Sequence, residues 1–278
     1  PFKTLNFAIE CAGNKRIQAD LYDQPTNGRI LWRNAIEEWR NTKGVLLTDI
    51  FSNEDFSSEK KILVAEGYDG FKVAIPLFEI PSEAMIAYHK DRKLIPHEKG
   101  GIRLIMPGKS GFLHIKWLKT LHIKEIEKPE DIFKIAPSLN SYKHIPLYNE
   151  KTSFSYSTKV KNAILSHQDN ENVTYRDTIS GTTHSGNGIK IKDVTIVIKD
   201  STNQTYSVCT KLTDTDKFLT QKWEIKLPET IKPGKIELTI ISTDMNGNKT
   251  CNDIKHISNK NQVHLNMHSK VQLNLLAK

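Results

Sequence analysis

The second half of the chain alternates apolar and polar residues along 189–192, and residues 194–198 keep valine or isoleucine at every second position. Successive side chains of a strand point to opposite faces of a sheet, so a period of two is typical of strands. Further runs of strand type occur at short intervals, at residues 163–167, 173–181, 204–212, 221–227 and 235–244. Turns with glycine, asparagine or proline separate several of them, at residues 185–188, 232–234 and 245–248. Short strands at this spacing predict an all-β sandwich of immunoglobulin type.

The first half mixes the patterns of strand and helix. Residues 60–77 predict two short strands around a tight turn, because two glycines at the centre permit the chain to reverse. Residues 31–41 place tryptophans and aliphatic residues at helix-like spacing, and residues 82–94 begin with helical propensity. Residues 101–108 predict a strand that ends at a Pro-Gly break. We therefore expect an α+β fold class, with a mixed first domain followed by the immunoglobulin-like sandwich.

A change in composition separates the two parts. Residues 127–151 are rich in proline, asparagine and lysine, which is typical of a linker. We expect a first domain over residues 1–135, a linker over 136–155, an immunoglobulin-like domain over 156–258, and a last strand or tail over 259–278. His264 and His268 lie in that final segment, and we interpret them as solvated side chains rather than metal ligands.

The formal net charge of +8 makes nucleic acid the first partner to consider. The lysines are scattered, however, and no block of five like charges occurs in the sequence. We therefore predict no nucleic-acid partner, and attribute the charge to a solvated surface with local positive potential around an anionic ligand. No run approaches the roughly 18 apolar residues of a membrane span, so no span is predicted.

Cys11 follows a short apolar run and precedes a bend-prone segment and two cations, Lys15 and Arg16. Cations beside a thiol lower its pKa and favour the thiolate, which is both the nucleophile and the metal ligand. A buried structural cysteine at the end of a strand explains the same pattern equally well. Cys209 and Cys251 can form a bridge in an oxidising compartment, but three cysteines do not make a disulfide framework.

Residues 107–111, with the sequence PGKSG, resemble part of a phosphate-binding P-loop. That motif requires two glycines separated by four residues before its lysine. Gly101 and Gly108 are instead separated by six residues of strand type. We therefore reject a P-loop, and keep the interpretation of a glycine-rich turn near an anionic group.

Five segments of the first half occur in an order that resembles the sulfite oxidase family. They read CAGNKR, NAIEEW…GVLLTDIF, GYDGFKVAIPL, MIAYHKDRKL and GGIRLIMPGKSGFLHIKWLKTLHI. Residues 5–127 are thereby similar to the molybdopterin-binding oxidoreductase domain of that family, and the strands after them resemble its dimerisation domain. The resemblance implies a molybdenum–molybdopterin cofactor, a homodimer, and oxygen-atom transfer to a small sulfur oxyanion, with sulfite oxidised to sulfate. Without a haem-binding segment, the electrons are expected to pass to a separate c-type cytochrome.

The resemblance also implies roles for individual residues. Cys11 matches the thiolate ligand of molybdenum, Arg16 an arginine that holds the anionic substrate, and Tyr88 an active-site tyrosine that donates a hydrogen bond near the metal. The remaining matches are residues that contact the cofactor: Asp69, Arg103, His114 and Lys116. Each also has a structural explanation, as a surface cation, a half-buried aromatic residue, a turn residue or a snorkelling lysine.

Three departures from the family pattern bear on the substrate and the cofactor. Ile189 stands where family members carry an arginine that clamps the oxyanion, and the lysines nearby supply charge without a bidentate fork. Lys99 stands in a segment where the family has a histidine followed by glycine. Only ten residues precede Cys11, so we expect the usual N-terminal part of the domain to be missing.

Two alternatives stay open at this point. Ile189 favours a related enzyme that acts on another sulfur compound, such as a sulfane or a sulfoxide. The missing segment favours a non-catalytic relative that acts through its β-sandwich, by dimerisation or by partner binding. The sequence does not set the compartment, although the periplasm is favoured if the chain is bacterial.

Overall fold

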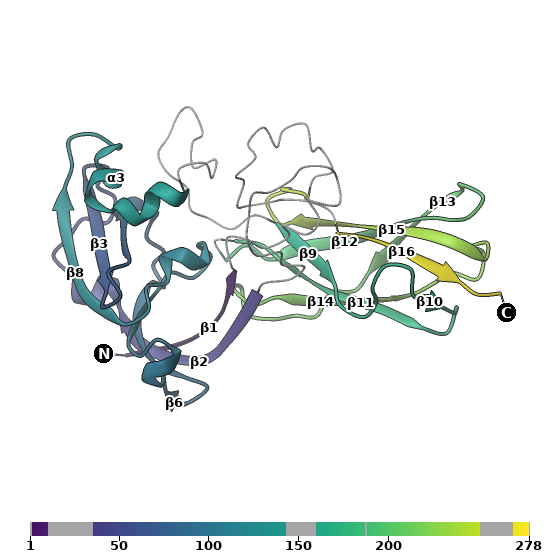
Figure 1. The fold of residues 1–278 in the computed structure, drawn as a ribbon, viewed down its shortest axis with the longest axis horizontal. Helices are drawn as coiled ribbons and strands as arrows, with labels where there is room; N and C mark the ends of the chain where they lie inside the picture. The colour runs from purple at the N-terminus through teal and green to yellow at the C-terminus, as the bar shows by residue number, and fades with distance from the viewer. Residues whose placement is uncertain (1, 11–35, 143–159, 187, 251–268, 278) are drawn as a thin grey trace.

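The computed structural model describes residues 2–10, 36–142, 160–186, 188–250 and 269–277. The first half of the chain builds two small β-sheets, on the left of Figure 1, and the second half builds a β-sandwich on the right. Strands β1 (Lys3–Glu10) and β2 (Ile36–Leu46) reach from the first half to the near end of the sandwich. In the part of the chain that the structure describes, no helix is long and apolar enough to cross a membrane.

The α+β prediction is wrong, because the described residues form a β-rich structure with no helical layer. The helices α2 (Leu47–Ile50) and α3 (Asp131–Ile135) have only four and five residues. The other helical segments of these ranges are 3-10 turns of three to six residues. Pairing between strands therefore supplies most of the regular backbone hydrogen bonds of both halves.

Both segments predicted to be helical contain strands. The described part of residues 31–41 belongs to β2, and residues 82–94 contain β5 (Met85–Lys90). In β2, the register places Trp39 opposite Phe7 of β1, and both side chains are buried. Burial against a neighbouring strand thus overrides a helix-like spacing of apolar residues, which is a weak signal over so short a run.

The first sheet has the strand order β1-β2-β5-β6, and β7 pairs with β5. Its later strands are short: β6 (Lys93–Leu94) and β7 (Arg103–Ile105). The antiparallel register of β5 and β7 sets Arg103 opposite Ala87, which is buried in the same cluster as Trp39. This register brings the Arg103 side chain to the buried face of the sheet, beside Trp39.

The second sheet has the strand order β4-β3-β8. Its strands are β3 (Lys61–Gly67), β4 (Lys72–Pro76) and β8 (Leu118–Glu125). The hairpin predicted over residues 60–77 is confirmed, because β3 and β4 pair antiparallel around a turn at Gly70, where φ is +78°. An apolar core joins this sheet to β7 and to the helical turns, and includes Leu63, Ile75, Leu104, Leu113 and Ile132.

The second half forms two sheets with the orders β10-β16-β15-β12-β13 and β14-β11-β9. The strands are β9 (Lys161–Ile164), β10 (Asn172–Val173), β11 (Thr178–His184), β12 (Ile191–Lys199), β13 (Thr205–Thr210), β14 (Gln221–Lys226), β15 (Gly234–Asp244) and β16 (Ser269–Leu275). Side chains from both sheets share one core, around Trp223, Ile196 and Leu238. In chain order, the smaller sheet corresponds to strands A, B and E of an immunoglobulin-type sandwich, and the larger contains the equivalents of C, C′, F and G.

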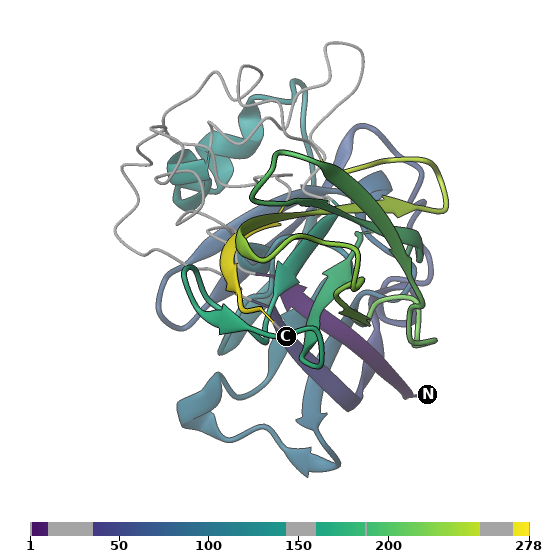
Figure 2. The ribbon, with the colours of Figure 1, turned by 90° about the vertical axis from the view of Figure 1, so that its right-hand side faces the viewer.

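A loop of the sandwich docks on β1 and β2, and the two halves are joined there. Phe218 buries its ring in the cluster that holds Phe7 and Trp39. Its carbonyl accepts a hydrogen bond of 2.8 Å from the Ala8 N–H. Figure 2 views the molecule from the sandwich end, with β1 leading into this junction.

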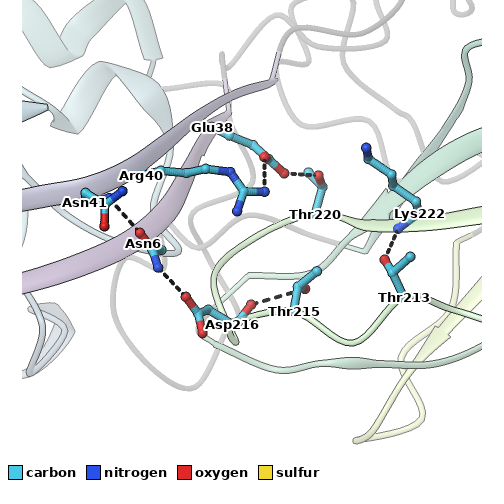
Figure 3. Close-up of polar contacts among 9 residues, drawn as sticks. All are labelled: Asn6, Glu38, Arg40, Asn41, Thr213, Thr215, Asp216, Thr220 and Lys222. Atoms are coloured by element: carbon cyan, nitrogen blue, oxygen red, sulfur yellow. Dashed lines mark hydrogen bonds and ion pairs between the residues drawn. The ribbon is translucent and has the colours of Figure 1, made fainter. Parts of the chain in front are cut away.

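Polar contacts also join this loop of the sandwich to β1 and β2 (Figure 3). Asn6 Nδ2 donates to Asp216 Oδ2 at 2.5 Å, and Asn6 Oδ1 accepts from the Asn41 N–H at 2.7 Å. The Thr220 hydroxyl donates to the Glu38 carboxylate. These contacts fix the loop of the sandwich to both strands at once, so the first sheet and the sandwich share one interface.

Candidate functional site

A cavity of about 800 Å³ opens beside β2, β5, β6 and β7. Its volume lies within the range of small-molecule sites. Eight charged residues line it: the cations Lys90, Lys93, Lys99, Arg103 and Lys116, and the carboxylates Glu37, Asp91 and Glu98. Five cations against three carboxylates leave a surplus of positive charge, so the cavity favours an anionic ligand.

Arg103 is the buried cation of this cavity. It lies at the start of β7 with only 6% of its surface exposed, and its guanidinium carbon is 4.5 Å from the centre of the Trp39 ring. Burial lowers the pKa of Arg103 to about 10, although the charge of Glu37 opposes this shift. Its Nε has no hydrogen-bond partner among the described residues. A buried donor on a cation is costly without an acceptor. An anion bound in the cavity would supply that acceptor, so Arg103 favours anion binding.

Trp39 carries a second cation on its ring, since Lys90 Nζ lies 4.5 Å from the ring centre. Lys90 also forms an ion pair with Glu37, whose side chain is mostly exposed at the mouth of the cavity. Burial opposes ionisation of Glu37, but the hydrogen bond from Lys90 and the charges of Lys90 and Arg103 hold the pKa of this carboxyl below its usual range. Glu37 is thus the internal counter-ion of the cavity.

Lys116, another cation of the cavity lining, lies against the backbone around Gly100. Gly100 has φ of +107°, and a Cβ at this position would lie 3.0 Å from the Lys116 side chain. The Gly100 carbonyl accepts a hydrogen bond of 2.6 Å from the Trp117 N–H. Because only glycine allows both the conformation and the close approach, this turn fixes where Lys116 leaves the backbone.

His114 lies behind the cavity and organises the loop that follows β7. Its Nδ1 accepts a hydrogen bond of 3.4 Å from the Met106 N–H, and its Nε2 lies 3.3 Å from the Lys109 carbonyl. Burial lowers the pKa of His114 to about 3, the hydrogen bond to Lys109 opposes this shift, and the charge of Arg103 adds to it. His114 is therefore neutral at physiological pH and donates a hydrogen bond from Nε2 to the Lys109 carbonyl. Its two ring nitrogens thus hold Met106 and Lys109 of the loop in place.

The structure brings together two of the predicted site residues and separates two others from them. Arg103 and Lys116 line the same cavity. Tyr88 is half-buried on β5 beside His89, with ring centres 4.9 Å apart, and is not among the lining residues. Asp69 is an exposed turn residue whose carboxylate accepts from the Phe71 N–H at 3.1 Å, as its structural explanation predicts.

Other predictions fall partly beyond what the structure describes. Cys11 and Arg16, the predicted metal ligand and substrate contact, lie outside the described residues, as do His264 and His268. Cys209 has a free thiol on the exposed side of β13, and Cys251 lies outside the described ranges.

Sequence reasoning missed Lys90, Lys93 and Trp39 as residues of the site. The run KDRK at residues 90–93 was a visible signal, since a cluster of cations after a strand favours an anion site. Trp39 gave no such signal, because its spacing was assigned to a helix. Only the register of β2 with β1 places its ring beneath Arg103.

Comparisons with known proteins bear mainly on the first half. Residues 1–132 match the family model described as the oxidoreductase molybdopterin binding domain. No curated protein matches the chain. Among solved structures, CopC from Methylosinus trichosporium OB3b is 14% identical, with 41% of this chain and 93% of that chain covered and a TM-score of 0.26. The GspB Siglec domain is 11% identical, with 43% and 58% covered and a TM-score of 0.28. TM-scores this low do not establish a shared fold for either half of the chain.

Proposed function

Residues 1–132 belong to the molybdopterin-binding oxidoreductase family, and on this premise we propose that the chain is a molybdenum-cofactor enzyme that oxidises sulfite to sulfate. The family membership supports an oxidoreductase with a molybdopterin cofactor. The sulfur oxyanion, the metal and the electron acceptor are parts of the proposal. In the net reaction, sulfite and water give sulfate, two protons and two electrons, and the electrons pass one at a time to a separate c-type cytochrome.

The cavity beside Arg103 fits the phosphate of such a cofactor. Arg103 offers a buried cation whose Nε has no hydrogen-bond partner among the described residues, and Lys90 and Lys116 add charge to the same cavity. Arginine binds phosphate through several donors at once, whereas lysine acts as a point charge. Arg103 would therefore orient the phosphate, and the lysines would neutralise it. The single observation that carries the proposal is this buried arginine, whose Nε has no hydrogen-bond partner among the described residues, inside a cavity of positive surplus.

The cofactor, when bound, supplies the oxygen-atom transfer, and the protein supplies ligation, orientation and charge. Cys11 would be the thiolate ligand, because soft thiolates suit such metals and Lys15 and Arg16 favour the deprotonated sulfur. Arg16 would hold the anionic substrate, and Tyr88 would donate a hydrogen bond near the metal. A homodimer formed through the β-sandwich completes the proposal.

One observation favours a second candidate, a related enzyme that acts on another sulfur compound such as a sulfane or a sulfoxide. Ile189 occupies the position where sulfite oxidation calls for an arginine, and the adjacent Lys190 is already paired with Asp214 at 2.6 Å. A lysine with a carboxylate partner adds little charge for an oxyanion. A substrate with less negative charge than sulfite therefore suits such a site better.

Turnover distinguishes these candidates. The chain is expressed with its natural N-terminus in a host that makes the molybdenum cofactor, and sulfite-dependent reduction of cytochrome c is measured. We expect turnover that falls by on the order of a hundredfold or more in Arg16→Met, since an oriented charge contact is lost, and little change in Lys119→Met, an exposed lysine away from the cavity. Fast turnover of a sulfoxide or sulfane with none of sulfite would select the second candidate.

A further inference from the structure

A charged pair is completely buried where the two halves meet at the end of β1. Glu10 ends β1 with no exposed surface, and its carboxylate forms an ion pair with Lys161, which begins β9 and is 1% exposed. The register of β9 with β11 sets His184 opposite Lys161, and His184 is buried as well. Side chains from both halves thus share one site that is closed to solvent.

The same point touches the loop behind the candidate cofactor cavity. Glu10 forms a parallel backbone bridge with Ser110, which is fully buried. Ser110 follows Lys109, whose carbonyl contacts the Nε2 of His114. The end of β1, the loop after β7 and the start of the sandwich therefore meet at one place.

Stability alone does not account for this pair. Two charges are expensive to remove from water, and a buried ion pair can often be replaced by apolar residues of similar size without loss of stability. A buried pair does impose one arrangement, because either charge is strongly disfavoured when it does not face the other. Burial holds the pKa of His184 below the ordinary value, although the charge of Glu10 opposes this shift, so Lys161 supplies the positive charge that faces Glu10.

We propose that Lys161 is a positioning residue of the cofactor site: it reaches from the second half of the chain, holds Glu10, and fixes the end of β1 that leads into Cys11. The sandwich would thereby take part in cofactor binding through its first strand, in addition to any role in dimerisation. The part of this proposal that concerns Cys11 as a metal ligand rests on the proposed function, whereas the ion pair of Lys161 with Glu10 does not.

Lys161→Met tests the proposal, because it removes the ammonium group that pairs with the buried Glu10 carboxylate. Hydrogen exchange at the amides of residues 8–10 is expected to rise by on the order of a hundredfold, and the molybdenum content of the isolated holoenzyme is expected to fall. Lys217→Met is the matched control, since Lys217 also pairs across the two halves, with Glu83, but is half-exposed. Its exchange at residues 8–10 is expected to change by less than about threefold.

The double variant Glu10→Gln, Lys161→Met separates positioning from stability, and it also serves if the single variant does not fold. With both charges removed, the unfolding midpoint is expected to return to the wild-type value. Exchange at residues 8–10 is expected to stay at least about tenfold above wild type, with reduced molybdenum content, because the arrangement is no longer imposed. Wild-type exchange and wild-type metal content in the double variant would overturn the proposal. If the wild-type chain binds no molybdenum, the proposed function fails, and the exchange comparison still decides whether Lys161 fixes β1.

Discussion

Replacement of Arg103 by methionine is expected to stabilise the cofactor-free chain and to remove its affinity for phosphate. Arg103 is a buried cation that lies over Trp39, and its Nε has no partner among the described residues. Methionine keeps an apolar chain of similar length against the tryptophan ring. It removes a charge that, among the described residues, is favoured by the carboxylate of Glu37 alone.

The pKa of Arg103 gives the magnitude. Burial lowers the pKa of Arg103 from its ordinary value to about 10, which corresponds to roughly 3 kcal/mol against the charged form. The folded pKa lies below the unfolded one, so this penalty is complete below about pH 10 and disappears only above the ordinary pKa of arginine. Loss of the cation–π contact with Trp39 lowers the stability of the variant by about 1–2 kcal/mol, which offsets part of the gain from removing the charge. A net gain of about 1–2 kcal/mol in the free energy of unfolding remains for Arg103→Met.

Urea unfolding of the cofactor-free chain, with and without inorganic pyrophosphate, measures both effects. Wild type is expected to be stabilised by the ligand, because a ligand that binds only the folded state adds to its stability. Arg103→Met is expected to be more stable without the ligand and unresponsive to it. Arg40→Met, at a half-exposed arginine, is the control and should change stability by less than about 0.5 kcal/mol. A loss of stability in Arg103→Met, with an unchanged response to pyrophosphate, would refute this reasoning.

Three further predictions concern stability. The pKa of His114 is about 3 in the folded chain and 6.5 in the unfolded chain. The contribution of the neutral ring to the free energy of unfolding should therefore be fully present above about pH 6.5 and fall by about 3 kcal/mol at pH 4.5. In urea unfolding, His114→Gln should abolish this loss, and His122→Gln should not. Gly181→Ala would place a Cβ 2.4 Å from the Trp223 ring, so we expect a loss of about 1–3 kcal/mol and a changed tryptophan spectrum, and unchanged values would contradict that packing. Phe218→Ala removes the ring that docks the sandwich on β1, and should cost about 3–5 kcal/mol. In calorimetry we expect one unfolding transition for wild type and two for this variant.

The strands of the second half were predictable because alternation and turn residues are both local signals. Residues 189–200 and 235–244 lie in β12 and β15 almost as predicted. The strand character of residues 36–46 was not predictable in the same way. Trp39 is buried through its pairing with Phe7, more than thirty residues earlier, and no pattern within a short window carries that contact.

Some residues of the candidate site were predictable from the sequence and others were not. Arg103 and Lys116 were found through the family resemblance, and the structure places both on one cavity. Lys90 was missed because its role depends on the ring of Trp39 beneath it. Asp69 matched the family by position, but its carboxylate closes its own turn, which is what the local sequence GYDG alone indicates.

The molybdenum content of the purified chain tests the central claim most directly. The chain with its natural N-terminus is expressed in a host that makes the cofactor, and metal and pterin phosphate are measured in wild type, Cys11→Ser and Arg103→Met. We expect about one molybdenum per wild-type chain, little or none in Cys11→Ser, and reduced pterin phosphate in Arg103→Met. No molybdenum in the wild type, or equal content in all three proteins, would contradict the assignment of this chain as a molybdenum enzyme.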